Sequence, residues 1–212
     1  PCLLIHEKGL VKTTKFSAPK YIGDPINTVK IFNEKNVDEI FIADIEASIN
    51  KTDPDYKLIA KLAIECRMPL CYAGGIDSIE KALKIIELGV EKIALGTAAI
   101  EQPTLIKELV AKLGSQSVVV VMDMKKRMFK NVYEVFTLNG KKASGISGHD
   151  LAIKMQELGA GEIIINSIDK DGTLSGYDFQ LIESIAKDIR IPFSILGGAG
   201  SLIDVQKLVT QY

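Results

Sequence analysis

The sequence predicts an α/β fold, a (β/α)8 TIM barrel built from two duplicated half-barrels. Short, continuous apolar runs alternate with amphipathic helical stretches along the 212 residues, a pattern typical of parallel strands that are buried on both faces. The stretches YAGGIDS (72–78) and ILGGAGS (195–201) are similar and lie 123 positions apart. A repeat at one fixed offset indicates internal duplication.

The same offset relates a second pair of blocks, DEIFIADI (38–45) and GEIIINSI (161–168). Two similar halves of four strands each close naturally into an eight-stranded ring. The alternative is an open, doubly wound sheet, but the glycine-rich fingerprint that such sheets carry after their first strand is absent from this chain. Duplication therefore favours the barrel.

Seven strands are expected. In chain order they are CLLI (2–5), IFIADI (40–45), LCYAGG (70–75), KIALGT (92–97), VVVVMD (118–123), EIIINS (162–167) and FSILGG (193–198). Amphipathic helices are predicted between them. The helix at 78–89 has Ser78 as its N-cap and Gly89 as its terminator, and the stretches 55–66 and 177–189 repeat its apolar spacing.

The first half ends with VEKIALGTAAI at 90–100, so its counterpart in the second half would begin near position 213, after the last residue, Tyr212. We therefore expect one barrel domain over 1–212, with half-barrels at about 1–115 and 116–212. Its eighth βα unit is expected to lie outside this sequence. Because the chain does not start with Met, we also expect a few residues to precede Pro1.

One stretch, 124–147, interrupts the alternation after the fifth strand. It contains a strand-like run, 132–137, that ends at Asn139 and Gly140. The stretch is long for a βα connection, and it lies at the end of the barrel where enzymes of this fold keep their active sites. Such connections are functional or disordered, and the strand-like run favours a functional one.

The composition excludes several classes of protein. The chain is 47% apolar and 25% charged with a net charge of −1, which fits a globular protein with a good core and does not suggest a nucleic-acid or membrane surface. Cys2, Cys66 and Cys71 lie in apolar runs without metal-ligand spacing, so we expect core residues of a cytoplasmic protein. No metal or cofactor is expected.

Each half carries a Gly-Gly pair between a strand and a helix start, Gly74–Gly75 and Gly197–Gly198. Glycine lets backbone N–H groups approach an anion, and a helix N-terminus adds positive potential. Two such corners on opposite sides of the barrel mouth would bind a substrate with a phosphate at each end. The alternative is that the glycines only make tight turns. Neighbouring segments add further donors, namely Gly96, Thr97, Gly172 and Thr173.

Asp123 ends the apolar fifth strand, the position that supplies catalytic groups in this fold. Burial could raise the pKa of this carboxyl and suit it to general acid–base catalysis. Its alternative role is to cap a turn or helix. Asp169 and Asp171 follow the sixth strand together. One of them could orient the loop or bind a substrate hydroxyl, or both could belong to a plain Asp-Gly turn.

Several blocks resemble one known family, the HisF-type cyclase subunit of imidazole glycerol phosphate synthase. They are GDPINTVKIFNEKNVDEI, AGGIDSIEKALKIIELGVEKI, GSQSVVVVMDMKKR, GAGEIIINSIDKDGTLSGYD and GGAG. The resemblance covers the whole chain. It implies a biphosphorylated aminoimidazole-carboxamide ribonucleotide substrate. It also implies a HisH-type glutaminase partner that delivers ammonia through the barrel axis.

The resemblance also implies roles for individual residues. Asp123 matches a catalytic aspartate, and Lys12 matches a lysine that holds substrate. Gly75, Thr97, Asp171, Gly172 and Gly198 match positions of the phosphate sites. A charged gate at the bottom of the barrel, where ammonia enters, is matched by Glu39, Lys92 and Glu162. Each of these three stands at the start of a strand, and the alternative is a solvated ring of ion pairs.

The chain departs from the family at the first strand. The family has an aspartate where this chain has Leu4, and loss of a general acid or base typically lowers a rate by about 10²- to 10⁴-fold. At the end of the fourth strand, HisF proteins commonly have an asparagine where this chain has Gly96. In this position the chain is more similar to the sister HisA isomerase. The run CLLI together with KFSAPKYIGDPIN is similar to a HisF-like paralogue associated with acetamidino sugars of surface polysaccharides.

Four functions remain open from the sequence. The first is an ammonia-using synthase subunit that serves acetamidino-sugar formation. The second is a cyclase of histidine biosynthesis that tolerates Leu4. A HisA-like isomerase is the third, although it also requires an acid on strand one. The fourth is a non-catalytic scaffold that activates a glutaminase, but the retention of Asp123 and of both Gly-Gly pairs disfavours it.

Overall fold

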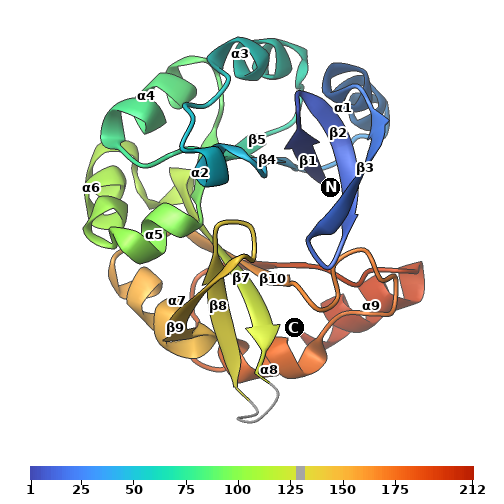
Figure 1. Cartoon of the computed structure of the whole chain (residues 1–212), viewed down its shortest axis with the longest axis vertical. Helices are drawn as coiled ribbons and strands as arrows, with labels where there is room; N and C mark the ends of the chain where they lie inside the picture. The colour runs from blue at the N-terminus through green and yellow to red at the C-terminus, as the bar shows by residue number, and fades with distance from the viewer. Residues whose placement is uncertain (128–131) are drawn as a thin grey trace.

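The computed structural model describes residues 1–127 and 132–212. Its sheet curls around an axis and is surrounded by helices (Figure 1), so the predicted α/β barrel architecture is confirmed. Seven parallel strands follow one another in the order β11-β10-β7-β6-β5-β4-β1. They are β1 (Cys2–His6), β4 (Ile40–Asp44), β5 (Leu70–Ala73), β6 (Lys92–Leu95), β7 (Val118–Lys126), β10 (Glu162–Ser167) and β11 (Phe193–Leu196).

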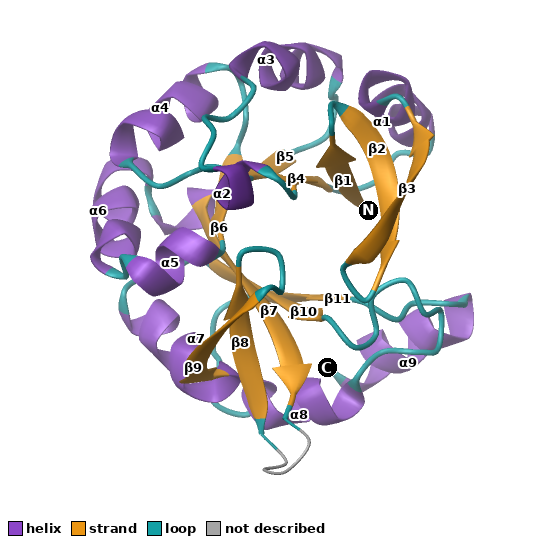
Figure 2. Cartoon of the chain, viewed as in Figure 1, coloured by secondary structure: helices purple, strands orange, loops and turns teal. Residues whose placement is uncertain are grey.

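The helices cover the outside of this sheet (Figure 2). The longer ones are α1 (Pro25–Glu34), α3 (Tyr56–Glu65), α4 (Ile79–Glu87), α6 (Thr104–Leu113), α7 (Gly148–Glu157), α8 (Phe179–Ala186) and α9 (Leu202–Gln211). The short ones are α2 (Ala47–Asn50), α5 (Thr97–Glu101) and the 3-10 turn η1 (Ser115–Ser117). Ser78 caps α4 as predicted, and Ser201 caps α9 at the same offset. Helix α8 ends at Ala186, before the predicted Ile189.

Each half of the chain places an antiparallel hairpin after its first strand. The first hairpin, β2 (Gly9–Thr14) with β3 (Ser17–Gly23), was not expected from the sequence. The second, β8 (Tyr133–Thr137) with β9 (Lys142–Ser147), contains the predicted strand-like run. The stretch predicted to be functional, 124–147, includes 128–131, which lie outside the described residues.

Two separate apolar layers result from this arrangement. The larger one lies between the outer face of the sheet and the helices, where side chains such as Ile42, Ile93 and Leu109 are fully buried. The smaller one lies on the opposite face of the strands, inside the ring. Its members are Phe41, Cys71, Ala73, Ala94, Val119, Val121, Ile164 and Leu196. Burial on both faces explains why the strands read as continuous apolar runs.

None of the helices in the described part of the chain has the length and apolar character that crossing a membrane requires.

Candidate active site

Asp123 lies on the inner face of β7, near its carboxyl end. Side chains alternate along a strand, so Asp123 shares a face with Val119 and Val121, which belong to the inner layer. Its carboxylate is half-buried, and Oδ1 accepts a hydrogen bond of 2.9 Å from Nδ2 of Asn166 on the neighbouring strand β10. The structure therefore places Asp123 inside the ring, as the sequence predicted.

Burial inside the ring raises the pKa of Asp123 to about 7. The hydrogen bond from Asn166 lowers the pKa, and the negative charge of Asp171 raises it. A carboxyl group that titrates near neutral pH can both donate and accept a proton under ordinary conditions. The role of Asp123 as a general acid–base stays a prediction.

Asp171 holds the first hairpin over the ring. Its Oδ2 accepts hydrogen bonds from Oγ1 of Thr13 at 2.7 Å and from the backbone N–H of Phe16 at 3.0 Å. Its carbonyl accepts from the N–H of Lys15 at 3.0 Å. The carboxylate that was expected to bind substrate is therefore engaged by the tip of the hairpin.

Other predicted substrate ligands also have partners in the chain. Oδ2 of Asp169 accepts from the N–H of Lys126, at the end of β7, at 3.1 Å. Oγ1 of Thr97 accepts from the N–H of Leu138, in the turn of the second hairpin, at 3.0 Å. Oγ1 of Thr173 donates to the carbonyl of Lys170 at 2.8 Å. These groups position loops at the mouth in this conformation.

Lys12 lies on β2, where it pairs with Lys20 of β3. It is exposed, and within the described residues it makes no ion pair with a carboxylate. The structure does not bring Lys12 into contact with Asp123, so its expected role in holding substrate stays a prediction.

The two Gly-Gly corners lie on opposite sides of the ring. Gly74 and Gly75 follow β5, Gly197 and Gly198 follow β11, and three strands separate β5 from β11 in the sheet order (Figure 2). All four glycines have positive φ, between 69° and 128°. A Cβ added at any of them would lie too close to backbone atoms. At Gly198, for example, it would lie 2.2 Å from the carbonyl oxygen of Gly176. Glycine is thus required at these corners by conformation alone, whatever they bind.

The remaining predicted phosphate glycines differ from one another. Gly172 has φ +65°, and a Cβ there would lie 2.0 Å from the carbonyl oxygen of Thr13. The lack of a side chain at Gly172 therefore lets the β2–β3 hairpin pack against this loop. Gly96 has negative φ, and the nearest atom to an added Cβ is the carbonyl oxygen of Val121 at 3.8 Å. A Cβ at Gly96 would therefore meet no atom closer than an ordinary van der Waals contact.

Leu4 occupies the position in the first half that Asp123 occupies in the second. Asp123 pairs with Asn166 in the β7–β10 ladder, and Leu4 pairs with Ala43 in the β1–β4 ladder. Ala43 and Asn166 are related by the same 123-residue offset as the glycine corners. The register of the two ladders therefore pairs Leu4 with Ala43 as it pairs Asp123 with Asn166, which agrees with the expected duplication.

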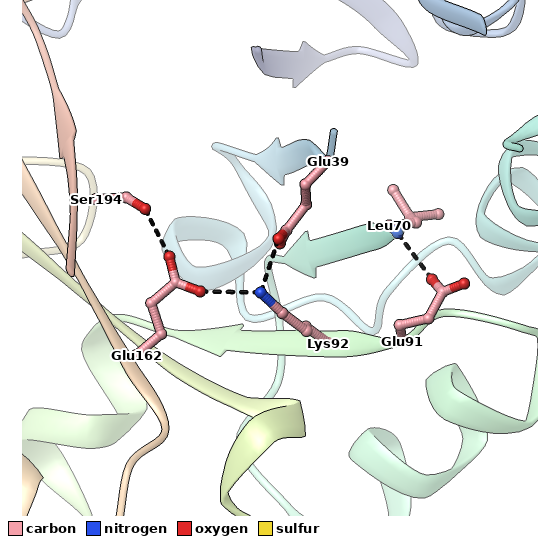
Figure 3. Close-up of polar contacts among 6 residues, drawn as sticks. All are labelled: Glu39, Leu70, Glu91, Lys92, Glu162 and Ser194. Atoms are coloured by element: carbon pink, nitrogen blue, oxygen red, sulfur yellow. Dashed lines mark hydrogen bonds and ion pairs between the residues drawn. The ribbon is translucent and has the colours of Figure 1, made fainter. Parts of the chain in front are cut away.

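Glu39, Lys92 and Glu162 come together at the amino-terminal ends of the strands (Figure 3). Nζ of Lys92 donates to Oε2 of Glu39 at 2.7 Å and to Oε2 of Glu162 at 3.0 Å. Oε1 of Glu162 accepts from the hydroxyl of Ser194 at 2.6 Å. Burial opposes the charge of Lys92, but the hydrogen bonds to both glutamates outweigh it, and the pKa of this lysine is raised.

The charged cluster and Asp123 stand at the two ends of the inner layer. Glu162, Ile164 and Asn166 alternate along one face of β10, and the first and last of these are about 13 Å apart at about 3.3 Å per residue. Between them the ring is lined by alanine, cysteine, valine and other apolar side chains. The arrangement is a column of apolar side chains, with the charged cluster at one end and Asp123 at the other.

Two residues of this site were not predicted from the sequence. Asn166 and Ser194 are polar residues within apolar strands, and each is the direct partner of a predicted residue. The 123-residue offset carried the only available signal, because it relates Asn166 to Ala43 and Ser194 to Cys71. A polar residue in only one half marks a local function and not a requirement of the ring.

Comparisons with known proteins agree with this geometry. The family described as "Histidine biosynthesis protein" matches residues 1–212. A Vibrio vulnificus protein named "Putative imidazole glycerol phosphate synthase subunit hisF3" is 48% identical over 211 residues, which are 100% of this chain and 81% of that protein. A Pseudomonas aeruginosa protein with the same name ending in hisF2 is 49% identical over 97% of this chain and 81% of that protein. The "Imidazole glycerol phosphate synthase subunit HisF" of Lactococcus lactis strain IL1403 is 38% identical over 97% of this chain and 79% of its own length.

Proposed function

The chain belongs to the histidine biosynthesis protein family, in its HisF branch, and we propose that it is the ammonia-using synthase subunit of a glutamine-dependent enzyme. Its reaction would join ammonia to a biphosphorylated small molecule held at the mouth of the barrel. Asp123 would exchange protons with that molecule. The partner would be a HisH-type glutaminase that supplies the ammonia.

The order of groups along the barrel axis carries this proposal. The cluster of Glu39, Lys92 and Glu162 closes one end, and Asp123 faces the other. Neutral ammonia could pass between apolar side chains such as those of the inner layer, whereas a charged ammonium ion would lose its hydration there at high cost. A glutaminase docked over the charged cluster could therefore deliver ammonia to Asp123 without releasing it to water.

The glycine corners at the mouth of the barrel suggest the class of substrate. Gly74–Gly75 and Gly197–Gly198 form corners on opposite sides, and each precedes a capped helix, α4 or α9. Backbone N–H groups at such corners suit phosphate, so a substrate with a phosphate at each end would span the mouth over Asp123. Gly96, Thr97, Gly172 and Thr173 would complete these sites after the hairpins release their present contacts.

Leu4 suggests which member of the family this is. With Leu4 in place of the aspartate on the first strand, the chain lacks one of the two groups that, by the family resemblance, guide ring closure and bond cleavage. The relatives named hisF3 and hisF2 are 48% and 49% identical to this chain, compared with 38% for the Lactococcus lactis HisF. We therefore propose a paralogue that serves acetamidino-sugar formation in surface-polysaccharide synthesis.

Turnover of the ribulosyl aminoimidazole substrate with ammonium salt tests the paralogue assignment. The wild type is expected to be slower than its Leu4→Asp variant by about 10²-fold or more, since one acid–base group contributes roughly that factor. Asp123→Asn serves as the inactive control. Wild-type turnover equal to that of Leu4→Asp would instead assign the chain to histidine biosynthesis.

A separate measurement tests the scaffold alternative. A HisH-type glutaminase is assayed for glutamine hydrolysis with wild-type protein and with Asp123→Asn. Equal stimulation by both, together with no ammonia-dependent product from either, would identify a scaffold. Synthesis that depends on Asp123 excludes it.

A further inference from the structure

Asp123 is held by one side chain of the neighbouring strand. Asn166 lies directly opposite it in the parallel β7–β10 ladder, and Nδ2 of Asn166 donates to Oδ1 of Asp123 at 2.9 Å. Both residues sit within regular strands, so the backbone register fixes their separation. Within the described residues, Asn166 is the one side chain that donates to this carboxylate.

We propose that Asn166 is a positioning residue, which anchors Oδ1 of Asp123 and leaves Oδ2 as the oxygen that exchanges a proton with the substrate. An amide N–H group donates a hydrogen bond to a carboxylate and keeps its own proton, so it stabilises the charged form of the carboxyl group. A proton that leaves Oδ2 arrives on the substrate, and the carboxylate that remains keeps the hydrogen bond from Asn166. The chemical step that uses the proton rests on the proposed function, but the paired side chains do not.

The surroundings of Asp123 make this donor important. The other titratable groups near it are Asp171, in the loop after β10, and the thiol of Cys2 on β1. Burial raises the pKa of Cys2 to about 12, so this thiol is neutral. Burial and the charge of Asp171 both raise the pKa of Asp123, and Asn166 acts against them. Asn166 therefore keeps the carboxyl in the range where it can donate and accept at neutral pH.

The first half of the barrel lacks both members of this pair. Leu4 stands in the place of Asp123, and Ala43 stands in the place of Asn166. The donor is thus present only in the half that has the carboxylate. A donor that merely stabilised the ring would be equally useful in both halves, so the asymmetry points to a role tied to Asp123.

Carbon-13 NMR of the carboxyl groups tests the proposal without any substrate. The signal of Asp123 is assigned by its loss in Asp123→Asn, and its titration midpoint is measured in the wild type, Asn166→Leu and Asn166→Asp. In the wild type the midpoint is expected near 7. In Asn166→Leu it is expected to rise by about one unit or more, because a hydrogen bond to a charged group is lost. The matched control, Ala43→Ser, changes the equivalent position of the first half and should leave the midpoint in place.

Asn166→Asp keeps the size of the side chain and gives a second measurement if Asn166→Leu does not fold. Two facing carboxyls should titrate in two steps more than one unit apart. An unchanged midpoint in a folded Asn166→Leu, or a single step at the wild-type midpoint in Asn166→Asp, would overturn the proposal. If the shifts occur but the protein makes no product from ammonia, the positioning role stands and the proposed function fails.

Discussion

At the scale of single residues, the barrel sets the chemistry of its few polar groups by enclosing them. Asp123 and Lys92 both lie on inward faces of strands, at opposite ends of the apolar layer. Burial pushes each toward its neutral form. Asp123 has one amide donor and a nearby negative charge, so its pKa stays raised. Lys92 has two carboxylates within 3.0 Å, which hold it charged.

Replacing Asp123 by Asn should stabilise the protein above neutral pH. The folded protein raises the pKa of Asp123 from 3.8 to about 7, so the stability that comes from its protonated form is complete below pH 4 and is lost as pH rises through 7. Asn carries no charge at any of these pH values. The gain in unfolding free energy should be near zero at pH 4 and up to about 4 kcal/mol at pH 8.5, as measured by urea titration. A gain that does not change with pH would contradict this.

Replacing Lys92 by Met should destabilise the protein, because it leaves Glu39 and Glu162 facing each other without a cation. The loss should be about 1–3 kcal/mol, less than for a fully buried pair, since these side chains are 35% and 17% exposed. Combining Lys92→Met with Glu162→Gln should restore most of the lost unfolding free energy, because one of the two unpaired charges is removed.

Lys81 offers a matched control, because it also bridges two carboxylates, Asp53 and Asp77, whose side chains are 71% and 58% exposed. Lys81→Met should lower the unfolding free energy by less than about 1 kcal/mol. Equal losses for the two lysines, measured by urea titration, would show that burial does not distinguish the clusters.

At the scale of elements, two hairpins and two Gly-Gly corners shape the mouth. Asp171 accepts hydrogen bonds from the tip of the β2–β3 hairpin, and Thr97 accepts one from the turn of the β8–β9 hairpin. The two turns also approach each other, since a Cβ at Gly140 would lie 3.0 Å from the ring of Phe16. The loops that would bind substrate are therefore the loops that hold the hairpins.

Asp171→Ala should loosen the first hairpin without unfolding the barrel. The amide of Phe16 loses its acceptor, so its hydrogen exchange should accelerate about tenfold or more, which corresponds to a hydrogen bond of about 1.4 kcal/mol. Asp169→Ala is the control, because Asp169 accepts from Lys126 instead. Exchange at Phe16 that is equally fast in both variants would show that Asp171 does not hold the hairpin.

Gly198→Ala should destabilise the protein more than Gly96→Ala. Gly198 has φ +99°, and a Cβ there would lie 2.2 Å from the carbonyl oxygen of Gly176, whereas Gly96 has negative φ and its nearest atom would be 3.8 Å from an added Cβ. We expect a loss of about 2 kcal/mol or more for the first variant and of less than about 1 kcal/mol for the second. Thermal denaturation of both variants measures the difference, and a reversed order would contradict the backbone geometry.

At the scale of the whole molecule, the parallel strands give the barrel a direction. Their amino ends carry the charged cluster and their carboxyl ends carry Asp123, with the apolar inner layer between. The proposed partner and the proposed substrate would therefore bind opposite ends. Their only connection through the interior would be the inner layer, which makes the path of ammonia testable.

Ala94→Leu should narrow this path, because Ala94 belongs to the inner layer. Glutamine-dependent synthesis with the glutaminase should fall, while synthesis from ammonium salt, which enters from the mouth, should persist. Ala82→Leu is a matched control, since Ala82 is equally buried but lies in the outer layer. A fall in both activities, or an equal fall in the control, would argue against passage through the ring.

Much of the fold could be predicted because it depends on local patterns. Seven apolar runs became the seven parallel strands, and Ser78 capped its helix as its position indicated. The β2–β3 hairpin could not be predicted, since β3 is almost wholly exposed and the hairpin is held by Asp171, more than 150 positions away. Such a contact leaves no periodic signal in the chain. The expected eighth βα unit and the division into half-barrels stay predictions.

The sequence by itself determined the barrel class, the succession of seven strands and the positions of the glycine corners, because each depends on residue type and spacing along the chain. That Leu4 stands in place of an aspartate follows from the resemblance to the HisF family, and the duplication stays a prediction. Only the tertiary structure decided that Asn166 holds Asp123, that Ser194 holds Glu162 and that Asp171 is engaged by a hairpin. These pairings join strands and loops that meet only when the sheet curls. Their hydrogen bonds depend on register and distance in space, which residue order alone does not specify.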